Sequence, residues 1–152
     1  MATIFSLSSL LVMLFWFLAI LLPRWRWTQR IMQSPLVAAA AALLYAILVL
    51  PQLGSLLPLL MQPSLVSIAA LLGTPAGATI AWIHFLAFDL FVGRWIYLDS
   101  RERGNTAWIV SPLLFLTLMF GPLGFVTYLC FRAGYAAIRA RGSQVRRESA
   151  VL

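Results

Sequence analysis

The feature of this sequence that most constrains its fold is a series of long apolar runs, each close to the roughly 20 residues that a helix needs to cross a bilayer. Hydrophobic residues make up 62% of the 152-residue chain and charged residues only 10%. Soluble domains average about a quarter charged residues, and the mean hydropathy here is +0.95. We therefore expect an all-α polytopic membrane protein, with a single transmembrane domain over residues 1–152 and no separate soluble domain.

The apolar runs predict a bundle of four transmembrane helices, over residues 4–22, 35–50, 76–98 and 108–131. The first run has no positive segment before it and no small-residue cleavage site after it, so we expect a retained helix and not a removed signal peptide. Gly121 and Pro122 interrupt the last run near its middle. They predict a kink, whose freed carbonyls need neighbouring polar groups or a cavity.

Residues 51–75 form the connector between the second and third spans, and they are rich in proline and glycine. Pro58 and Pro63 disfavour an uninterrupted spanning helix, although residues 56–72 are almost wholly apolar. We expect a short helix over about residues 63–72 that lies in or near the membrane interface. A re-entrant segment and a fifth span are the alternatives.

Most of the charged residues flank the apolar runs. All eleven basic residues are arginine, four acids oppose them, and the net charge is +7. Arginine at the ends of apolar spans is typical of anchoring to anionic lipid headgroups, so we expect no nucleic-acid partner. With four spans, the arginines of residues 24–30 and 101–103 lie on one side of the membrane and those of the tail, residues 132–152, on the other. The positive-inside rule then nearly cancels, and only the weight of the first helix favours a cytoplasmic position for residues 23–34.

Few residues could hold a metal or a cofactor. The single cysteine, Cys130, excludes an internal disulfide, and its apolar surroundings predict a small buried side chain. With only one cysteine and one histidine, the chain offers no zinc or iron site, and we expect no required metal or cofactor. No nucleotide-binding loop and no Ser/His/Asp arrangement is recognisable.

The third span carries three ionisable residues within its apolar run, His84, Asp89 and Arg94. Such groups cost on the order of a few kcal/mol each at the bilayer centre, so an intramembrane cluster is a candidate site. At about 100° per residue, successive members of the three point about 140° apart and are stacked about 7.5 Å apart along the axis. They therefore do not form a triad on one helix face, and each needs a partner on a neighbouring helix.

Several partners are open to these groups. Asp89, near the midpoint of the span, is protonated, paired with an arginine, or bonded to an indole or to a hydroxyl of Tyr45, Thr117, Thr127 or Tyr128. His84 bonds across helices, relays protons, or gives an axial nitrogen to a chlorophyll magnesium. Arg94 extends towards the headgroups, pairs with Asp89, or contacts a polar ligand group. Packing is the simpler role for each, and proton transfer by His84 and Asp89 is the functional one.

Aromatic residues surround the ionisable groups. Rings and conjugated chains pack well by dispersion, so an aromatic groove suits a long planar polyene. Bundle core and lipid contact are the simpler interpretation. The candidate ligand-binding residues are Trp82, Phe85, Phe88, Phe91, Arg94, Trp95 and Tyr97.

The run from Trp82 to Tyr97, WIHFLAFDLFVGRWIY, resembles the signature of the abscisic-acid-deficient-four-like family. The likeness includes a Pro-x-Trp element at residues 23–25 and a Gly-Pro-Leu-Gly element at residues 121–124. Members are small four-span membrane proteins of chloroplasts, cyanobacteria and other bacteria. The plant members are required for converting violaxanthin to neoxanthin, an epoxide-opening isomerisation that creates an allene.

The resemblance implies an integral membrane protein of xanthophyll metabolism, and its reaction would be a redox-neutral isomerisation that needs no electron carrier. The absence of a transit peptide favours the thylakoid or plasma membrane of a cyanobacterium-like organism. Asp89 would protonate the epoxide oxygen while His84 removes a proton along the polyene. Their opposed directions on the helix weigh against joint action on one atom.

A non-enzymatic role is the competing hypothesis. The chain would then be a carotenoid- or chlorophyll-binding accessory subunit or assembly factor of a photosynthetic membrane complex. The expected partners are a carotenoid or lipid, such a complex, or a second copy of the chain. Solute transport is a weaker hypothesis, because the sequence shows no repeated half.

Overall fold

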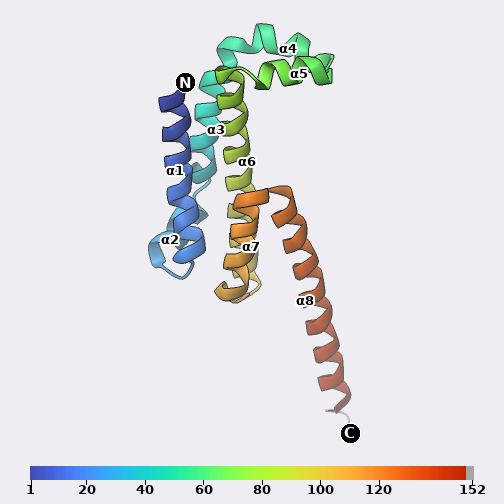
Figure 1. The fold of residues 1–152 in the computed structure, drawn as a ribbon. Coiled ribbons are helices and arrows are strands. Elements are labelled where there is room, and N and C mark those ends of the chain that lie inside the picture. The colour runs from blue at the N-terminus through green and yellow to red at the C-terminus, as the bar shows by residue number, and fades with distance from the viewer. Residues whose placement is uncertain (150–152) are drawn as a thin grey trace.

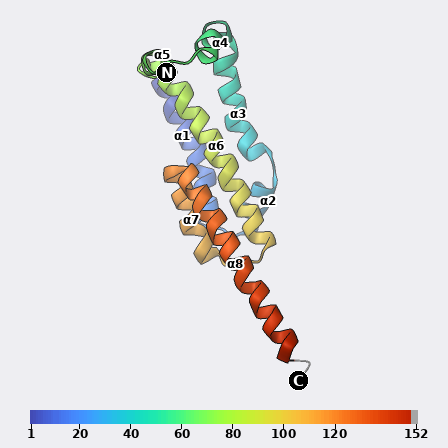
Figure 2. The same cartoon turned by 90° about the vertical axis from the view of Figure 1, so that its right-hand side faces the viewer.

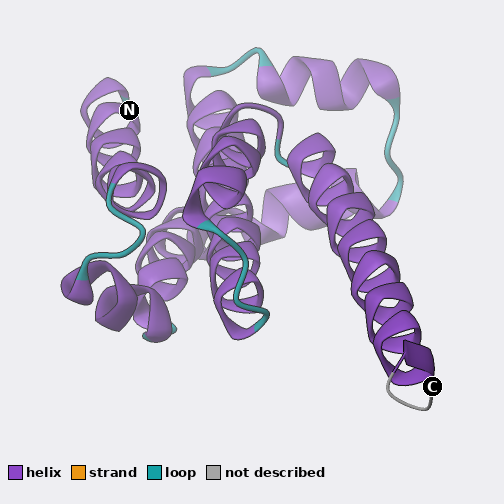
Figure 3. Ribbon diagram, turned by 90° about the horizontal axis from the view of Figure 1, so that it is seen from below, coloured by secondary structure: helices purple, strands orange, loops and turns teal. Residues whose placement is uncertain are grey.

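The structure, a computed structural model, describes residues 1–149, and the side chains of residues 1–138. Every regular element in this part of the chain is a helix, which confirms the predicted all-α class (Figure 3). The elements are α1 (Ala2–Leu21), α2 (Arg26–Gln33), α3 (Leu36–Val49), the 3-10 turn η1 (Leu50–Gln52), α4 (Leu53–Met61), α5 (Leu65–Leu72), α6 (Pro75–Glu102), α7 (Ala107–Phe120) and α8 (Pro122–Ser149).

Among residues 1–149, three stretches are long and apolar enough to cross a membrane, which indicates a membrane protein. They are α1, α6, and the stretch Leu36–Met61 that contains α3 and α4. The chain descends through α1, returns through α3 and descends again through α6 (Figure 1). Helix α6 packs against both of the others, so the residues of its signature run lie at the centre of the bundle.

A glycine in the signature run lets α1 and α6 approach closely. Trp16 of α1 is only 2% exposed, and its ring lies directly on Gly93 of α6. A Cβ atom at position 93 would overlap three atoms of that ring. The buried face of α6 continues through Ile83, Leu90 and Ile96.

The connector contains two short helices, α4 and α5, which lie across one end of the bundle (Figures 1 and 2). Helix α5 agrees with the predicted short helix, and Ser64 and Ser67 close its N-terminus with reciprocal hydrogen bonds. Helix α4 was not predicted, because it contains Pro58. With 9 and 8 residues, neither α4 nor α5 is long enough to be a fifth span. Their depth in a bilayer stays a prediction.

The structure does not contain the predicted fourth span over residues 108–131. Two antiparallel helices, α7 and α8, replace it, and the chain reverses at Gly121 instead of kinking there (Figure 1). Gly121 has a φ of +28°, in the region that glycine tolerates, and Pro122 then occupies the first position of α8. Helix α7 has 14 residues and is therefore about 21 Å long, short of the roughly 30 Å of a hydrocarbon core.

The reversal brings the tail back to the end of the molecule where α6 finishes. Arg132 of α8 lies beside Asp99 of α6, with 3.6 Å between the guanidinium Nε and the carboxylate Oδ2. The structure thus places Arg132 at the same end of the molecule as residues 101–103, whereas the predicted fourth span would carry it to the other end. Cys130 is exposed on α8 and not buried as predicted, because α8 has α7 along only one side.

Candidate functional site

His84 lies on the side of α6 that faces α3. Its ring centroid is 5.2 Å from that of Tyr45 and 4.8 Å from that of Phe88. Phe85 meets the same imidazole edge-on, with 6.1 Å between the ring centroids. The half-buried histidine is thus surrounded by aromatic rings, as expected from the spacing of Phe88 and His84 on the helix.

A groove adjoins this aromatic group, and we call it the alanine groove. It has a volume of about 400 Å³ and is lined by Pro35, Ala38, Ala39, Ala42, Ala87, Phe88 and Phe91. The alanines form its floor because their side chains end at Cβ. Phe88 and Phe91 are 59% and 55% exposed, so their rings stand out from α6 as a wall. The groove is apolar, and it opens on the side of the bundle that would face lipid.

Arg94 binds the backbone at the end of α2, just before Pro35 of the alanine groove. Its Nη2 donates to the carbonyl of Gln33 at 2.8 Å, and its Nε donates to the carbonyl of Ser34 at 3.2 Å. Both carbonyls lie at the C-terminal end of α2, where a cation is favourable. Arg94 therefore holds α2 against α6, and the alternative pairing with Asp89 is not made.

Asp89 lies on a different side of α6, at the tip of the α7–α8 hairpin. A Cβ atom at Gly121 would overlap its Oδ1, so the carboxyl group and the helix reversal are in direct contact. The predicted hydroxyl partners bond elsewhere. Tyr128 donates to Asp99, the hydroxyls of Thr117 and Thr127 donate to carbonyls of their own helices, and Tyr45 packs on His84. Asp89 and His84 thus face different neighbours, as their angular separation predicts.

Three other predicted ligand-binding residues join helices together. Trp82 donates from Nε1 to Ser9 of α1 at 2.8 Å. The buried Tyr97 donates from its hydroxyl to the carbonyl of Pro23 at 2.7 Å. Trp95 packs edge-on against Tyr128 of α8, with 5.8 Å between the ring centroids. Of the predicted site residues, the structure therefore places His84, Phe88 and Phe91 on the side of α6 that faces α3, with Phe85 against His84, and it places Arg94 on the end of α2.

Sequence reasoning missed a polar cluster around Asp99. Its Oδ2 accepts hydrogen bonds from Tyr128 at 2.6 Å and Arg103 at 2.8 Å, and Arg132 lies nearby. The bond to this carboxylate raises the pKa of Arg103 above its usual value. The four-residue spacing of Asp99 and Arg103 is the one feature of the sequence that indicates this cluster. Tyr128 and Arg132 reach the cluster only because the chain reverses at Gly121.

Comparison with known proteins gives one match. Neither the curated proteins nor the solved structures contain a similar chain. The model of the ABA DEFICIENT 4-like family matches residues 3–128, which include nearly all of α1, the helices from α2 to α7, the whole signature run and the hairpin tip. The chain belongs to the ABA DEFICIENT 4-like family.

Proposed function

We propose that this protein acts in xanthophyll metabolism and receives a membrane-embedded carotenoid in the alanine groove. The groove itself carries the proposal. It is apolar, alanines and two phenylalanines line it, and such a lining suits a hydrocarbon chain with conjugated bonds. The only histidine of the chain lies beside it, with its ring centroid 4.8 Å from that of Phe88. Family membership supports the same class of substrate, and thylakoid or plasma membrane residence belongs to this proposal.

The proposed reaction is the epoxide-opening isomerisation of a xanthophyll. One C–O bond of the epoxide breaks, one C–H bond of the polyene breaks, and one O–H bond forms, so no electrons leave the substrate. A single proton passes from carbon to oxygen. His84 is the ionisable side chain next to the alanine groove, and its imidazole can accept that proton and return it. Asp89 faces the hairpin tip, so this version of the reaction does not use it.

Filling the groove tests the proposal. Ala42 lines it, whereas the next residue, Leu43, lies on the lipid-facing surface of α3 and does not. Purified protein in lipid nanodiscs is incubated with an epoxy-xanthophyll, and the products are separated by chromatography. We expect Ala42→Trp to lower conversion about tenfold or more, which corresponds to about 1.4 kcal/mol, and Leu43→Trp to leave it unchanged. Equal conversion by both variants would refute the groove as the substrate site.

A pigment-binding accessory role is the second candidate, and the same groove favours it. Absorption spectra of gently purified protein separate the two functions. Stoichiometric carotenoid with no turnover of added epoxy-xanthophyll supports the accessory role, and product formation supports the enzyme. In either case Ala42→Trp should reduce the amount of bound pigment, because its indole occupies the floor of the groove.

A further inference from the structure

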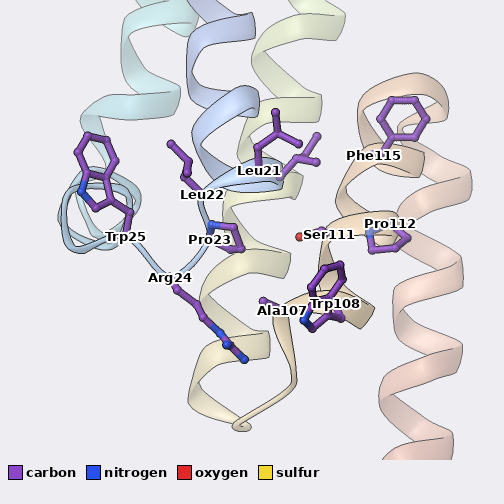
Figure 4. Close-up of a pocket in the computed structure, with 11 residues that line it drawn as sticks. Leu21, Leu22, Pro23, Arg24, Trp25, Ala107, Trp108, Ser111, Pro112 and Phe115 are labelled. Carbon is purple, nitrogen blue, oxygen red and sulfur yellow. The ribbon is translucent and has the colours of Figure 1, made fainter.

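A second, larger groove lies between the end of α1 and α7, on helices that do not line the alanine groove (Figure 4). Its volume is about 700 Å³. Leu21, Arg24 and Trp25 form one side of it, and Trp108, Ser111 and Phe115 of α7 form the other. We call it the α1–α7 groove.

The two ends of the α1–α7 groove differ in polarity. Leu21 and Phe115 line its apolar part, and both are largely exposed. At the other end, beside Arg24, the indole of Trp108 is 83% exposed (Figure 4). Indole rings on a membrane protein favour the headgroup level. The mouth of the groove therefore lies among lipid headgroups, and its interior extends towards the hydrocarbon.

The mouth is positively charged. Among the described residues, Arg24 makes no ion pair, and the ion pairs found there join Asp99 to Arg103 and to Arg132. A second guanidinium lies nearby: Arg101 donates from Nη1 to the carbonyl of Pro23 at 3.4 Å, and it lines a small adjoining pocket together with Arg24. Two arginines beside an apolar groove match a ligand that carries an anionic group at one end and a hydrocarbon chain at the other.

We propose that the α1–α7 groove binds an anionic phospholipid. Its phosphate contacts Arg24 at the mouth, and one acyl chain lies along Leu21 and Phe115. Ser111, on the α7 wall, offers a hydroxyl within the groove. The net charge of the chain, +7, adds a general attraction for anionic lipid. The groove adds a defined place for one molecule, and this proposal is independent of any reaction at the alanine groove.

Lipid titration followed by native mass spectrometry tests the proposal. The full-length protein in detergent receives phosphatidylglycerol or phosphatidylcholine with identical acyl chains. We expect one phosphatidylglycerol to bind more tightly than phosphatidylcholine. Arg24→Gln should weaken phosphatidylglycerol binding about tenfold, because it removes a charge-assisted hydrogen bond.

Arg26→Gln is the matched control, since Arg26 is exposed two residues further on and does not line the groove. It should leave the affinity for phosphatidylglycerol nearly unchanged. Equal losses in the two variants would reduce the effect to general electrostatics and overturn the proposal, as would equal affinity for the two lipids. Ser111→Trp, which fills the groove, should abolish tight binding while the melting temperature without lipid stays that of the unaltered protein. Displacement of phosphatidylglycerol by a xanthophyll would assign the groove to pigment and also overturn the proposal.

Discussion

Residue 93 shows how one missing side chain sets the distance between two helices. The ring of Trp16 occupies the space where a Cβ atom would lie, and the indole is almost wholly buried there. Such close packing leaves no free volume to absorb an added methyl group. Gly93 therefore has a structural role within the signature run, next to residues for which we propose a chemical role.

We expect Gly93→Ala to lower the free energy of unfolding by about 1–3 kcal/mol, the usual cost of overpacking. Gly134 on α8 is the matched control, because no atom lies within 4 Å of a Cβ built there. Gly134→Ala should be neutral or slightly stabilising, since alanine favours helix more than glycine does. Thermal unfolding in mild detergent measures both variants. Equal stability of the two variants would contradict the contact between Gly93 and Trp16.

His84 and Asp89 also have different roles in our proposal, because they lie on different sides of α6. Only His84 lies beside the alanine groove, whereas Asp89 contacts the hairpin tip. In the conversion assay we expect His84→Ala to lower the rate about 100-fold, the lower range for loss of a general acid or base. Asp89→Asn should retain most of the activity. The reverse result would move the chemistry to the α7–α8 hairpin.

At the scale of elements, the α7–α8 hairpin is the unit that departs most from expectation. Gly124 has no room for a Cβ atom because Thr117 fills that space, so the two helices lie close together directly after the turn. Asp89 contacts the turn itself, at about the midpoint of α6. The chain therefore leaves the end of α6, runs back as α7, reverses beside the Asp89 side chain, and returns as α8.

A double-mutant cycle tests that contact. Gly121→Ala should destabilise the protein for two reasons, because the residue has a φ of +28° and because the new Cβ overlaps the Asp89 carboxylate. Asp89→Ala removes the second cause only. We therefore expect a favourable coupling of about 0.5–3 kcal/mol between the two substitutions in thermal or denaturant unfolding. Strict additivity would mean that Asp89 does not touch the hairpin tip.

At the scale of the whole molecule, the sequence predicts some levels of structure and not others. Hydropathy identifies α1, α3 and α6, because each is a long apolar run, and the helical repeat predicts that His84, Asp89 and Arg94 diverge. The sequence does not distinguish a kink from a reversal at Gly121, since glycine followed by proline suits both. Which one forms depends on long-range packing, namely Asp89 against Gly121 and Tyr128 against Asp99. The alanine groove likewise depends on which face of α3 meets α6.

The reversal gives the molecule a strong charge asymmetry. Residues 34–88, which include α4 and α5, contain no acidic or basic side chain apart from His84. The arginines lie on or beside α2, at the lower part of α6, and along α8, which runs on from that same end (Figure 2). Four spans would divide these arginines between both sides of the membrane. A hairpin places them together, so the positive-inside rule no longer cancels.

We predict that the arginine-rich end faces the cytoplasm, with α4, α5 and the N-terminus on the opposite side. Single cysteines are introduced into a Cys130→Ser background at Gln62 in the α4–α5 turn, at Gly104 between α6 and α7, and at Ser143 in the tail. Intact cells are then treated with a membrane-impermeant thiol reagent. Gln62→Cys should react at once, whereas Gly104→Cys and Ser143→Cys should react only after lysis, because the hairpin keeps both on the cytoplasmic side. Opposite labelling of positions 104 and 143 would require a spanning helix between them and would exclude the reversal at Gly121.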